Sequence, residues 1–131
     1  MKHFLLKFNH GVEIGARLAY LGHYDRTKDP EIKKIAQEEE EHRVMLEIIL
    51  AENNEKSNPI IDHIFWAIGS TIGVLCKVSP IFMLNWVASS MEMFAVFSYC
   101  KLGKLYPERH SAFGCMAFAE ERHKRYFRGE K

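Results

Sequence analysis

Two glutamate–histidine pairs at helical spacing carry the clearest chemistry in this sequence. Glu39 and His42 form one pair, and Glu120 and His123 form the other, each with two residues between its members. On a helix, residues three apart lie on the same face, a few ångströms from each other. A carboxylate and an imidazole placed in this way can bind one metal ion, so each pair predicts two metal ligands on one helix.

The pairs alone are weak evidence for a metal site. With this many Glu and His residues in 131 positions, roughly 0.75 such pairs are expected by chance. The acidic run from Glu38 to Glu41 is also typical of a solvated helix face, and Glu38 lies four residues before His42, so the register is not forced. The second pair has the alternative of a surface histidine beside Glu120.

A lone carboxylate in an apolar segment strengthens the metal hypothesis. Apart from Lys77, Glu92 is the only Asp, Glu, Lys or Arg within residues 63–100. An isolated buried carboxylate costs several kcal/mol or stays protonated, and a metal ion removes that cost. The alternative is a surface glutamate, or one paired with Arg17 or Arg122. Glu13 adds a fourth acidic position, so that each of four expected helices carries one.

Capping residues followed by proline mark where these helices are expected to begin. Asp29-Pro30, Asn58-Pro59 and Ser79-Pro80 each combine a side chain that caps a helix with a residue suited to its first turn, and Tyr106-Pro107 is expected to play the same part. Gly103 and Gly129 are expected to end the last two helices. The first expected helix begins at about Phe4 or Asn9 and ends at Tyr24, and the others cover residues 30–51, 59–76, 80–102 and 107–127.

The inner face of the second expected helix follows from its apolar spacing. We assign to this face Ile32, Ile35, Ala36, Glu39, His42, Val44, Met45, Leu46 and Ile49.

Four ligand-bearing helices and one long apolar connection predict the fold class. It is all-α, a ferritin-like antiparallel four-helix bundle with one long helical crossover between helices 2 and 3, in a single domain over residues 1–131. A Glu from each of two helices and a Glu-x-x-His pair from each of the other two is the ligand set of di-iron bundles. The predicted ligands are Glu13, Glu39, His42, Glu92, Glu120 and His123, for two iron ions, with manganese as the other candidate.

Composition excludes several other classes of function. The net charge is +1, so no broad basic field attracts nucleic acid. The three cysteines form no Cys-x-x-Cys motif, which argues against a disulfide framework and a rubredoxin-type iron site and fits a reducing compartment. The first residues are charged too early for a signal peptide. The longest uncharged runs, 63–76 and 78–91, are shorter than the roughly 20 residues that cross a bilayer.

The segment Asn9-His10-Gly11-Val12-Glu13-Ile14-Gly15-Ala16 resembles the opening motif of the demethoxyubiquinone hydroxylase family, the di-iron monooxygenases of ubiquinone biosynthesis. The resemblance continues through Glu39-x-x-His42, Gly69-Ser70-Thr71-Ile72-Gly73, Glu92 with Tyr99 seven residues later, and Glu120-x-x-His123, over about residues 8–127. It implies the same six metal ligands, with Tyr99 serving electron transfer from the quinol. The family usually has His before that tyrosine, where this chain has Ser98.

The resemblance implies an oxidoreductase that places one atom of oxygen on a hydrophobic, quinone-like ring. We expect it in the cytoplasm or peripherally on the inner face of a membrane, and the apolar region 63–100 would meet a membrane surface or a lipid-carrying partner. The sequence leaves open whether the protein forms a homo-oligomer. Two alternatives are a ferritin- or rubrerythrin-like protein that oxidises iron or reduces peroxide, and a helical bundle without catalytic activity.

Overall fold

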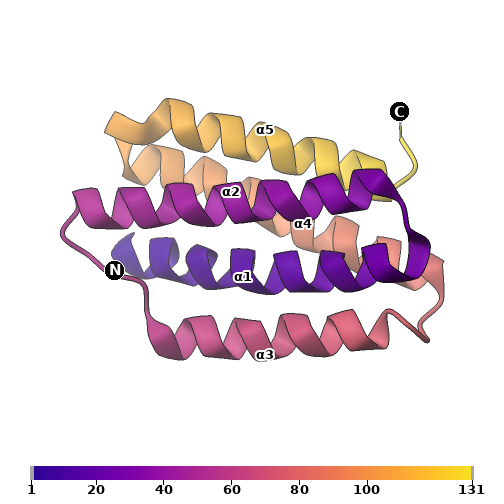
Figure 1. Ribbon diagram of the computed structural model, residues 1–131. Coiled ribbons are helices and arrows are strands. Elements are labelled where there is room, and N and C mark those ends of the chain that lie inside the picture. Colours follow the sequence, from indigo (N-terminus) through magenta and orange to yellow (C-terminus); the bar gives the residue numbers. More distant parts are fainter. Residues whose placement is uncertain (1, 131) are drawn as a thin grey trace. The chain divides into compact units, whose positions relative to one another are not determined.

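The computed structural model describes residues 2–130, and within them it contains helices and no strand (Figure 1). The helices are α1 (Lys2–Thr27), α2 (Pro30–Glu52), α3 (Pro59–Leu75), α4 (Ile81–Leu105), the short 3₁₀ helix η1 (Pro107–Arg109) and α5 (His110–Phe127). The predicted all-α class is therefore confirmed. The ferritin-like type of bundle stays a prediction.

The chain divides into two compact units, residues 1–79 and residues 80–131. The first unit contains α1, α2 and α3, and the second contains α4, η1 and α5. That the chain forms a single domain stays a prediction.

In the first unit, α1 lies between α2 and α3 (Figure 1). A short loop joins α1 to α2, so the two helices run antiparallel, and α3 runs in the same direction as α1. Apolar side chains that repeat with the period of a helix fill the interior. The most deeply buried of these, each at most 1% exposed, are Leu6, Ile35, Ala36, Leu46, Ile49 and Leu50.

Glycines bring α1 and α3 into direct backbone contact. A Cβ atom added at Gly69 would lie 2.3 Å from the backbone oxygen of Gly15, and one added at Gly22 would lie 2.3 Å from the Cα atom of Gly73. Real Cβ atoms do not approach other atoms so closely, so only glycine permits this packing. We call Gly15, Gly22, Gly69 and Gly73 the glycine seam.

Arg26 connects the C-terminal end of α1 to the C-terminal end of α3. Its guanidinium donates hydrogen bonds of 2.6 Å to the carbonyl of Cys76 and 2.8 Å to that of Ser79. These carbonyls follow α3, where backbone oxygens lack partners within the helix. Arg26, in the last turn of α1, therefore satisfies the end of α3 and holds the two helices in register.

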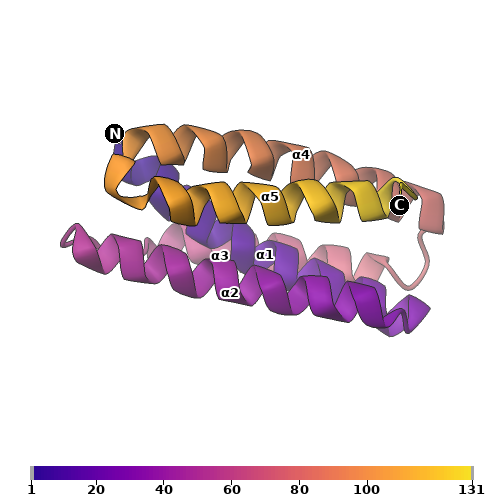
Figure 2. The same cartoon turned by 90° about the horizontal axis from the view of Figure 1, so that it is seen from above.

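In the second unit, α4 and α5 lie side by side and run antiparallel (Figure 2). An aromatic cluster forms where η1 joins them. The ring of Phe113 stacks on Tyr99 at a centroid distance of 6.2 Å and contacts Tyr106 at 6.0 Å. All three side chains are fully buried, and aromatic burial of this kind is a major stabilising contribution in a small helical unit.

Two of the three predicted caps are confirmed. An oxygen of Asp29 accepts from the backbone N–H of Glu31 at 2.9 Å, and an oxygen of Asn58 accepts from that of Ile60 at 2.9 Å. The Ser79 cap is wrong. Its hydroxyl donates backward to the carbonyl of Leu75 at 2.8 Å, and Pro80 takes the capping position of α4 without a side-chain bond.

Two further local predictions are also wrong. The helix expected to stop at Gly103 continues to Leu105, because a glycine inside a helix costs only about 1 kcal/mol and Gly103 packs against Phe113. Val44, expected on the inner face of α2, is 41% exposed. It lies two residues from both His42 and Leu46, and a helix turns about 200° over two residues.

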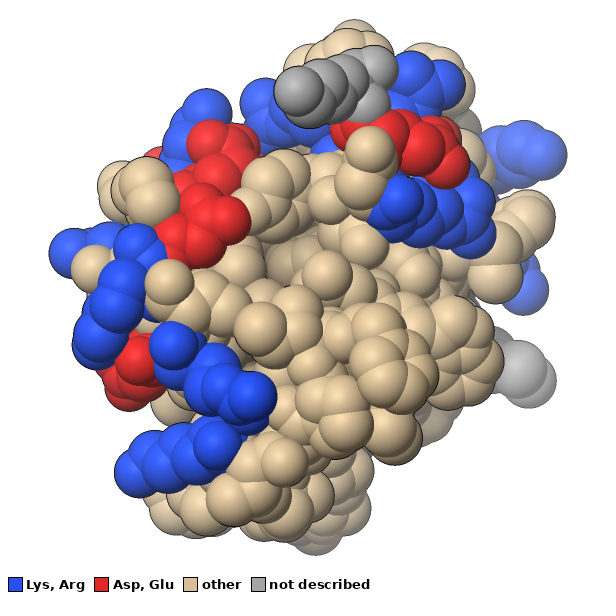
Figure 3. Space-filling model, turned by 90° about the vertical axis from the view of Figure 1, so that its right-hand side faces the viewer, with Lys and Arg blue, Asp and Glu red and all other residues tan. Residues whose placement is uncertain are grey.

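Large apolar side chains remain exposed on both units. Among the described residues, α4 is the one helix long and apolar enough to cross a membrane by length and composition, with 28% of its apolar window buried. A core helix of a soluble protein passes the same test. Figure 3 shows Lys and Arg side chains (blue) gathered beside Asp and Glu side chains (red), with uncharged residues (tan) between these groups.

Candidate metal centre

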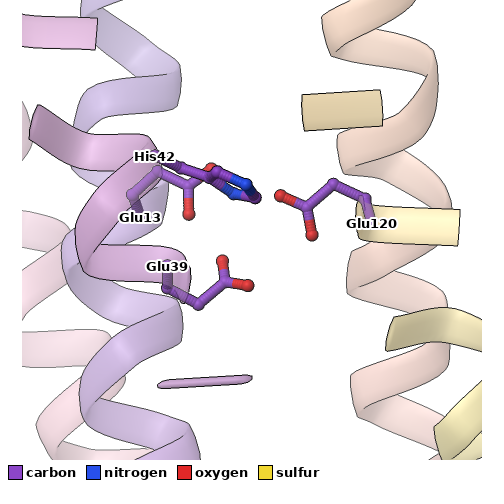
Figure 4. Close-up of side chains that lie close together, drawn as sticks. All are labelled: Glu13, Glu39, His42 and Glu120. Carbon is purple, nitrogen blue, oxygen red and sulfur yellow. The ribbon is translucent and has the colours of Figure 1, made fainter. Parts of the chain in front are cut away.

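The first unit gathers three of the predicted ligands, and we call Glu13, Glu39 and His42 the first half-site. Glu13 comes from α1, and the Glu39–His42 pair comes from α2. One ligand atom from each lies within 4.8 Å of the others. Glu13 and Glu39 are 2% exposed and His42 is 8% exposed. The three side chains project to the same side of their two helices (Figure 4).

The helix period places these ligands inward. Ile35 lies four residues before Glu39, and Leu46 lies four residues after His42, and both are fully buried core positions. Residues four apart share a helix face, so the apolar pattern that packs α2 also carries the Glu39–His42 pair into the interior. The Nδ1 atom of His42 lies 4.0 Å from the nearer oxygen of Glu13, which is close but beyond hydrogen-bond range.

The second unit gathers the other three, and we call Glu92, Glu120 and His123 the second half-site. Glu92 comes from α4 and the Glu120–His123 pair from α5. All three are at most 2% exposed, and one ligand atom from each lies within 4.8 Å of the others. The Nδ1 atom of His123 is 3.1 Å from a Glu120 oxygen and 3.8 Å from a Glu92 oxygen.

The two half-sites therefore repeat one arrangement. In each, a glutamate on one helix faces a Glu-x-x-His pair on its antiparallel neighbour. Two buried carboxylates so close together repel each other, and burying them as anions is costly unless a cation compensates the charge. Oxygen and imidazole donors suit iron or manganese, whereas structural zinc sites usually include cysteine. Each half-site is thus a buried Glu/His group that could hold a metal ion.

Tyr99 lies on α4 seven residues after Glu92, two helical turns away along the axis. It is fully buried and stacks on Phe113. Ser98, which stands where the resembling family has His, is 5% exposed. Both side chains are thus held inside the second unit, and the redox role of Tyr99 stays a prediction.

Near the first half-site, a buried histidine that is not a predicted ligand lies between two carboxylates. His10 is 2% exposed, and its Nδ1 lies 2.9 Å from Asp62 on α3 while its Nε2 lies 3.1 Å from Glu47 on α2. Both ring nitrogens thus face carboxylate oxygens, which accept hydrogen bonds. His10 links all three helices of the first unit, one turn before Glu13.

An arginine on α2 organises the acidic face beside the ligands. Arg43 donates hydrogen bonds of 2.9 and 2.7 Å to the carboxylate of Glu40 and also pairs with Glu47. The bond from Arg43 lowers the pKa of Glu40 below its ordinary value, and the pairing raises the pKa of Arg43. The acidic run is therefore divided. Glu39 points inward, whereas Glu40 is neutralised near the surface.

The chain matches no family model, no curated protein and no solved structure. What the fold and the two half-sites define is a helical protein with two buried Glu/His groups able to hold metal ions. Any narrower assignment rests on the ligand pattern and on the motif around Glu13.

Proposed function

We propose that the two half-sites combine into one site for a pair of iron ions, and that the protein is an oxygen-activating oxidoreductase. The observation that carries this proposal is the repeat. Each unit buries one glutamate beside a Glu-x-x-His pair, and the two sets together equal the ligand set of di-iron carboxylate bundles. Glu13, Glu39 and His42 from the first unit and Glu92, Glu120 and His123 from the second would hold the ions.

The charges of the combined set fit two divalent ions. Four carboxylates supply the negative charge that two ferrous ions neutralise, and two uncharged imidazoles complete the donors. Burial of all six side chains excludes bulk water and holds the ligands in fixed positions. Bound iron would supply the redox capacity that dioxygen activation requires, which no side chain of this set has by itself.

We propose a hydrophobic, quinone-like substrate on the strength of the motif from Asn9 to Ala16. In such a reaction one oxygen atom enters the ring and the other leaves as water, with the electrons coming from a reduced donor. Tyr99, buried two turns from Glu92, is the side chain we propose for electron transfer. A separate electron-donor protein is compatible with the lack of any Cys-x-x-Cys motif in the sequence.

The exposed apolar side chains of α3 support a site of action at a membrane surface or on a lipid-carrying partner. Ile64, Ile68 and Leu75 are each about half exposed, and Val74 is 63% exposed. Apolar patches of this kind usually mark an interaction surface. A hydrophobic substrate would reach the protein from such a surface.

Metal content and oxygen reactivity test the proposal. The protein is reconstituted with ferrous iron without oxygen, beside Glu39→Gln, Glu92→Gln and Glu41→Gln. Glu41 is the matched control, since it belongs to the same acidic run but is exposed. We expect about two irons per chain, reduced content in the first two variants only, and a near-ultraviolet absorption band after air is admitted. No stoichiometric iron, or iron retained in both ligand variants, would overturn the assignment.

The same ligand set could serve iron oxidation or peroxide reduction. Added ferrous iron or peroxide separates these reactions from oxygenation. Catalytic turnover of either one, with no product from quinols, would assign the centre to the ferritin- and rubrerythrin-like alternative.

A further inference from the structure

The second unit contains a pocket of about 390 Å³ between the start of α4 and the end of α5. This volume falls within the range of small-molecule sites. Its lining combines three aromatic rings, three small polar side chains and one arginine, namely Phe82, Asn85, Trp86, Ser89, Ser90, Phe127 and Arg128. None of these residues is among the predicted ligands.

The mouth of the pocket favours a negative charge. Lys124 and Arg125, in the last turn of α5, are both paired with Glu121, whereas the Arg128 side chain makes no ion pair or hydrogen bond with any residue from 2 to 130. Nearby, α4 begins without an acidic residue in its first turn and without a side-chain cap. Arg128 is the C-cap residue of α5, so the negative end of that helix dipole offsets the positive end of the α4 dipole, and the guanidinium charge decides the sign.

The walls of the pocket favour a ring. Phe82 is 73% exposed and Trp86 is 70% exposed, and two large aromatic side chains so open to solvent beside one cavity are unusual outside a binding surface. Phe127 also lines the pocket and is buried. Aromatic rings pack on one another in offset or edge-to-face contacts, so an aromatic group fits this space.

The floor of the pocket lies next to the second half-site. Ser89 precedes Glu92 by three residues on α4, and Phe127 follows His123 by four residues on α5, so both lie one helical turn, about 5 Å along the axis, from a ligand. Ser89 is 6% exposed and its hydroxyl donates to the carbonyl of Trp86 at 3.0 Å. The hydroxyl oxygen can therefore accept a hydrogen bond from a bound molecule.

We infer that this pocket binds an aromatic carboxylate, with the carboxylate on Arg128 and the ring between Trp86 and Phe127. Its place beside Glu92 makes such a compound the substrate class of the centre. That second statement rests on the proposed function, whereas binding itself requires no metal. It narrows the proposed hydrophobic substrate to one that carries an acidic group.

Tryptophan fluorescence tests the binding directly. The chain has two tryptophans, and Trp66→Phe leaves Trp86 as the single reporter inside the pocket. Metal-free protein is titrated with hydrocinnamate and with hydrocinnamyl alcohol, its neutral counterpart. We expect a saturable change with the acid and about fivefold weaker binding of the alcohol, the upper range for an exposed ion pair.

Variants assign the effect to the arginine. Arg128→Gln should weaken binding of the acid about fivefold and leave binding of the alcohol unchanged. Arg125→Gln, the control, removes an arginine one turn earlier that pairs with Glu121 and does not line the pocket. No saturable change, equal affinity for acid and alcohol, or an Arg128→Gln variant that binds the acid normally would overturn the inference.

The iron-loaded protein separates the two statements. Hydrocinnamate should shift the absorption of the iron-loaded protein and not that of iron-loaded Arg128→Gln at the same concentration. Binding without a shift would overturn the substrate role and uphold the pocket. Binding by a chain that takes up no iron would uphold the pocket and overturn the di-iron function.

Discussion

The two half-sites bury the same donors, yet the structures around them differ. In the first unit, α3 packs against α1 through the glycine seam, and the His10 network ties both helices to α2. The second unit has two long helices instead of three, and its pocket, one helical turn from the ligands, contains Arg128, whose side chain pairs with no other residue from 2 to 130. The two units thus share the same ligand geometry but differ in the contacts that hold the ligand-bearing helices. The first half-site is held by contacts among three helices, and the second, although equally buried, has a pocket next to it.

The largest expected change in stability comes from adding a side chain to the glycine seam. Gly69→Ala would place a Cβ atom 2.3 Å from the backbone of Gly15, so the backbones of α1 and α3 must separate. We expect a loss of about 3 kcal/mol in unfolding free energy, at the upper end for overpacking. Urea denaturation measures it.

Gly114→Ala is the matched control in the second unit. Apart from the neighbouring backbone of its own helix, no atom of residues 2–130 lies within 4 Å of a Cβ added there, so helix propensity alone acts, and the variant should be more stable by about 0.5–1 kcal/mol. If both alanine variants changed stability equally, the seam would not distinguish the units.

Removal of the histidine network should have the next largest effect. His10→Ala leaves the carboxylates of Asp62 and Glu47 without their shared partner, and we expect a loss of about 2 kcal/mol, typical of a hydrogen bond to a charged group. The control is His110→Ala in the second unit, where an exposed histidine contacts the carbonyl of Gly103 at 3.3 Å. A loss below that of the control would contradict the bracing role of His10.

The smallest expected change in stability comes from removing a surface ion pair in each unit. Arg43 lowers the pKa of Glu40 from its ordinary value of 4.5, so this pair stabilises the folded state above that pH and is lost as the pH falls through the folded-state pKa. Glu40→Gln should cost about 0.5 kcal/mol at neutral pH, since both side chains are partly solvated.

In the second unit, Lys124 and Arg125 likewise lower the pKa of Glu121. Glu121→Gln should cost less than Glu40→Gln, because one partner of Glu121, Arg125, is 60% exposed, whereas Arg43 is 22% exposed and holds Glu40 with two hydrogen bonds. The cost for Glu40→Gln should vanish on acidification well below its ordinary pKa. A cost independent of pH would show that packing, and not charge, holds Glu40.

Local rules predicted the helices well wherever a single side chain decides the outcome. The carboxylate of Asp29 and the amide of Asn58 cap as expected because each can accept from the N–H groups two or three residues ahead. Ser79 failed because its hydroxyl can instead donate to the preceding turn. Both Glu-x-x-His pairs point inward, because in each helix the pair lies on the same face as the apolar core residues.

Contacts between distant residues could not be read from the sequence in the same way. The spacing Gly11-x-x-x-Gly15 and Gly69-x-x-x-Gly73 is a signal of close helix packing, but it does not say which helices meet. His10 finds carboxylates that are 37 and 52 residues away. The pocket joins Trp86 to Arg128, and nothing in their spacing indicates that they line one cavity.

The most direct test of a joined metal site is the electron paramagnetic resonance spectrum of the protein loaded with Mn²⁺ at two equivalents per chain. If the half-sites hold a pair of ions about 4 Å apart, the spectrum will show exchange coupling between them, and either Glu13→Gln or Glu92→Gln will abolish the coupling. The hyperfine pattern of isolated Mn²⁺ ions at full loading would contradict the account, because the half-sites would then bind metal separately.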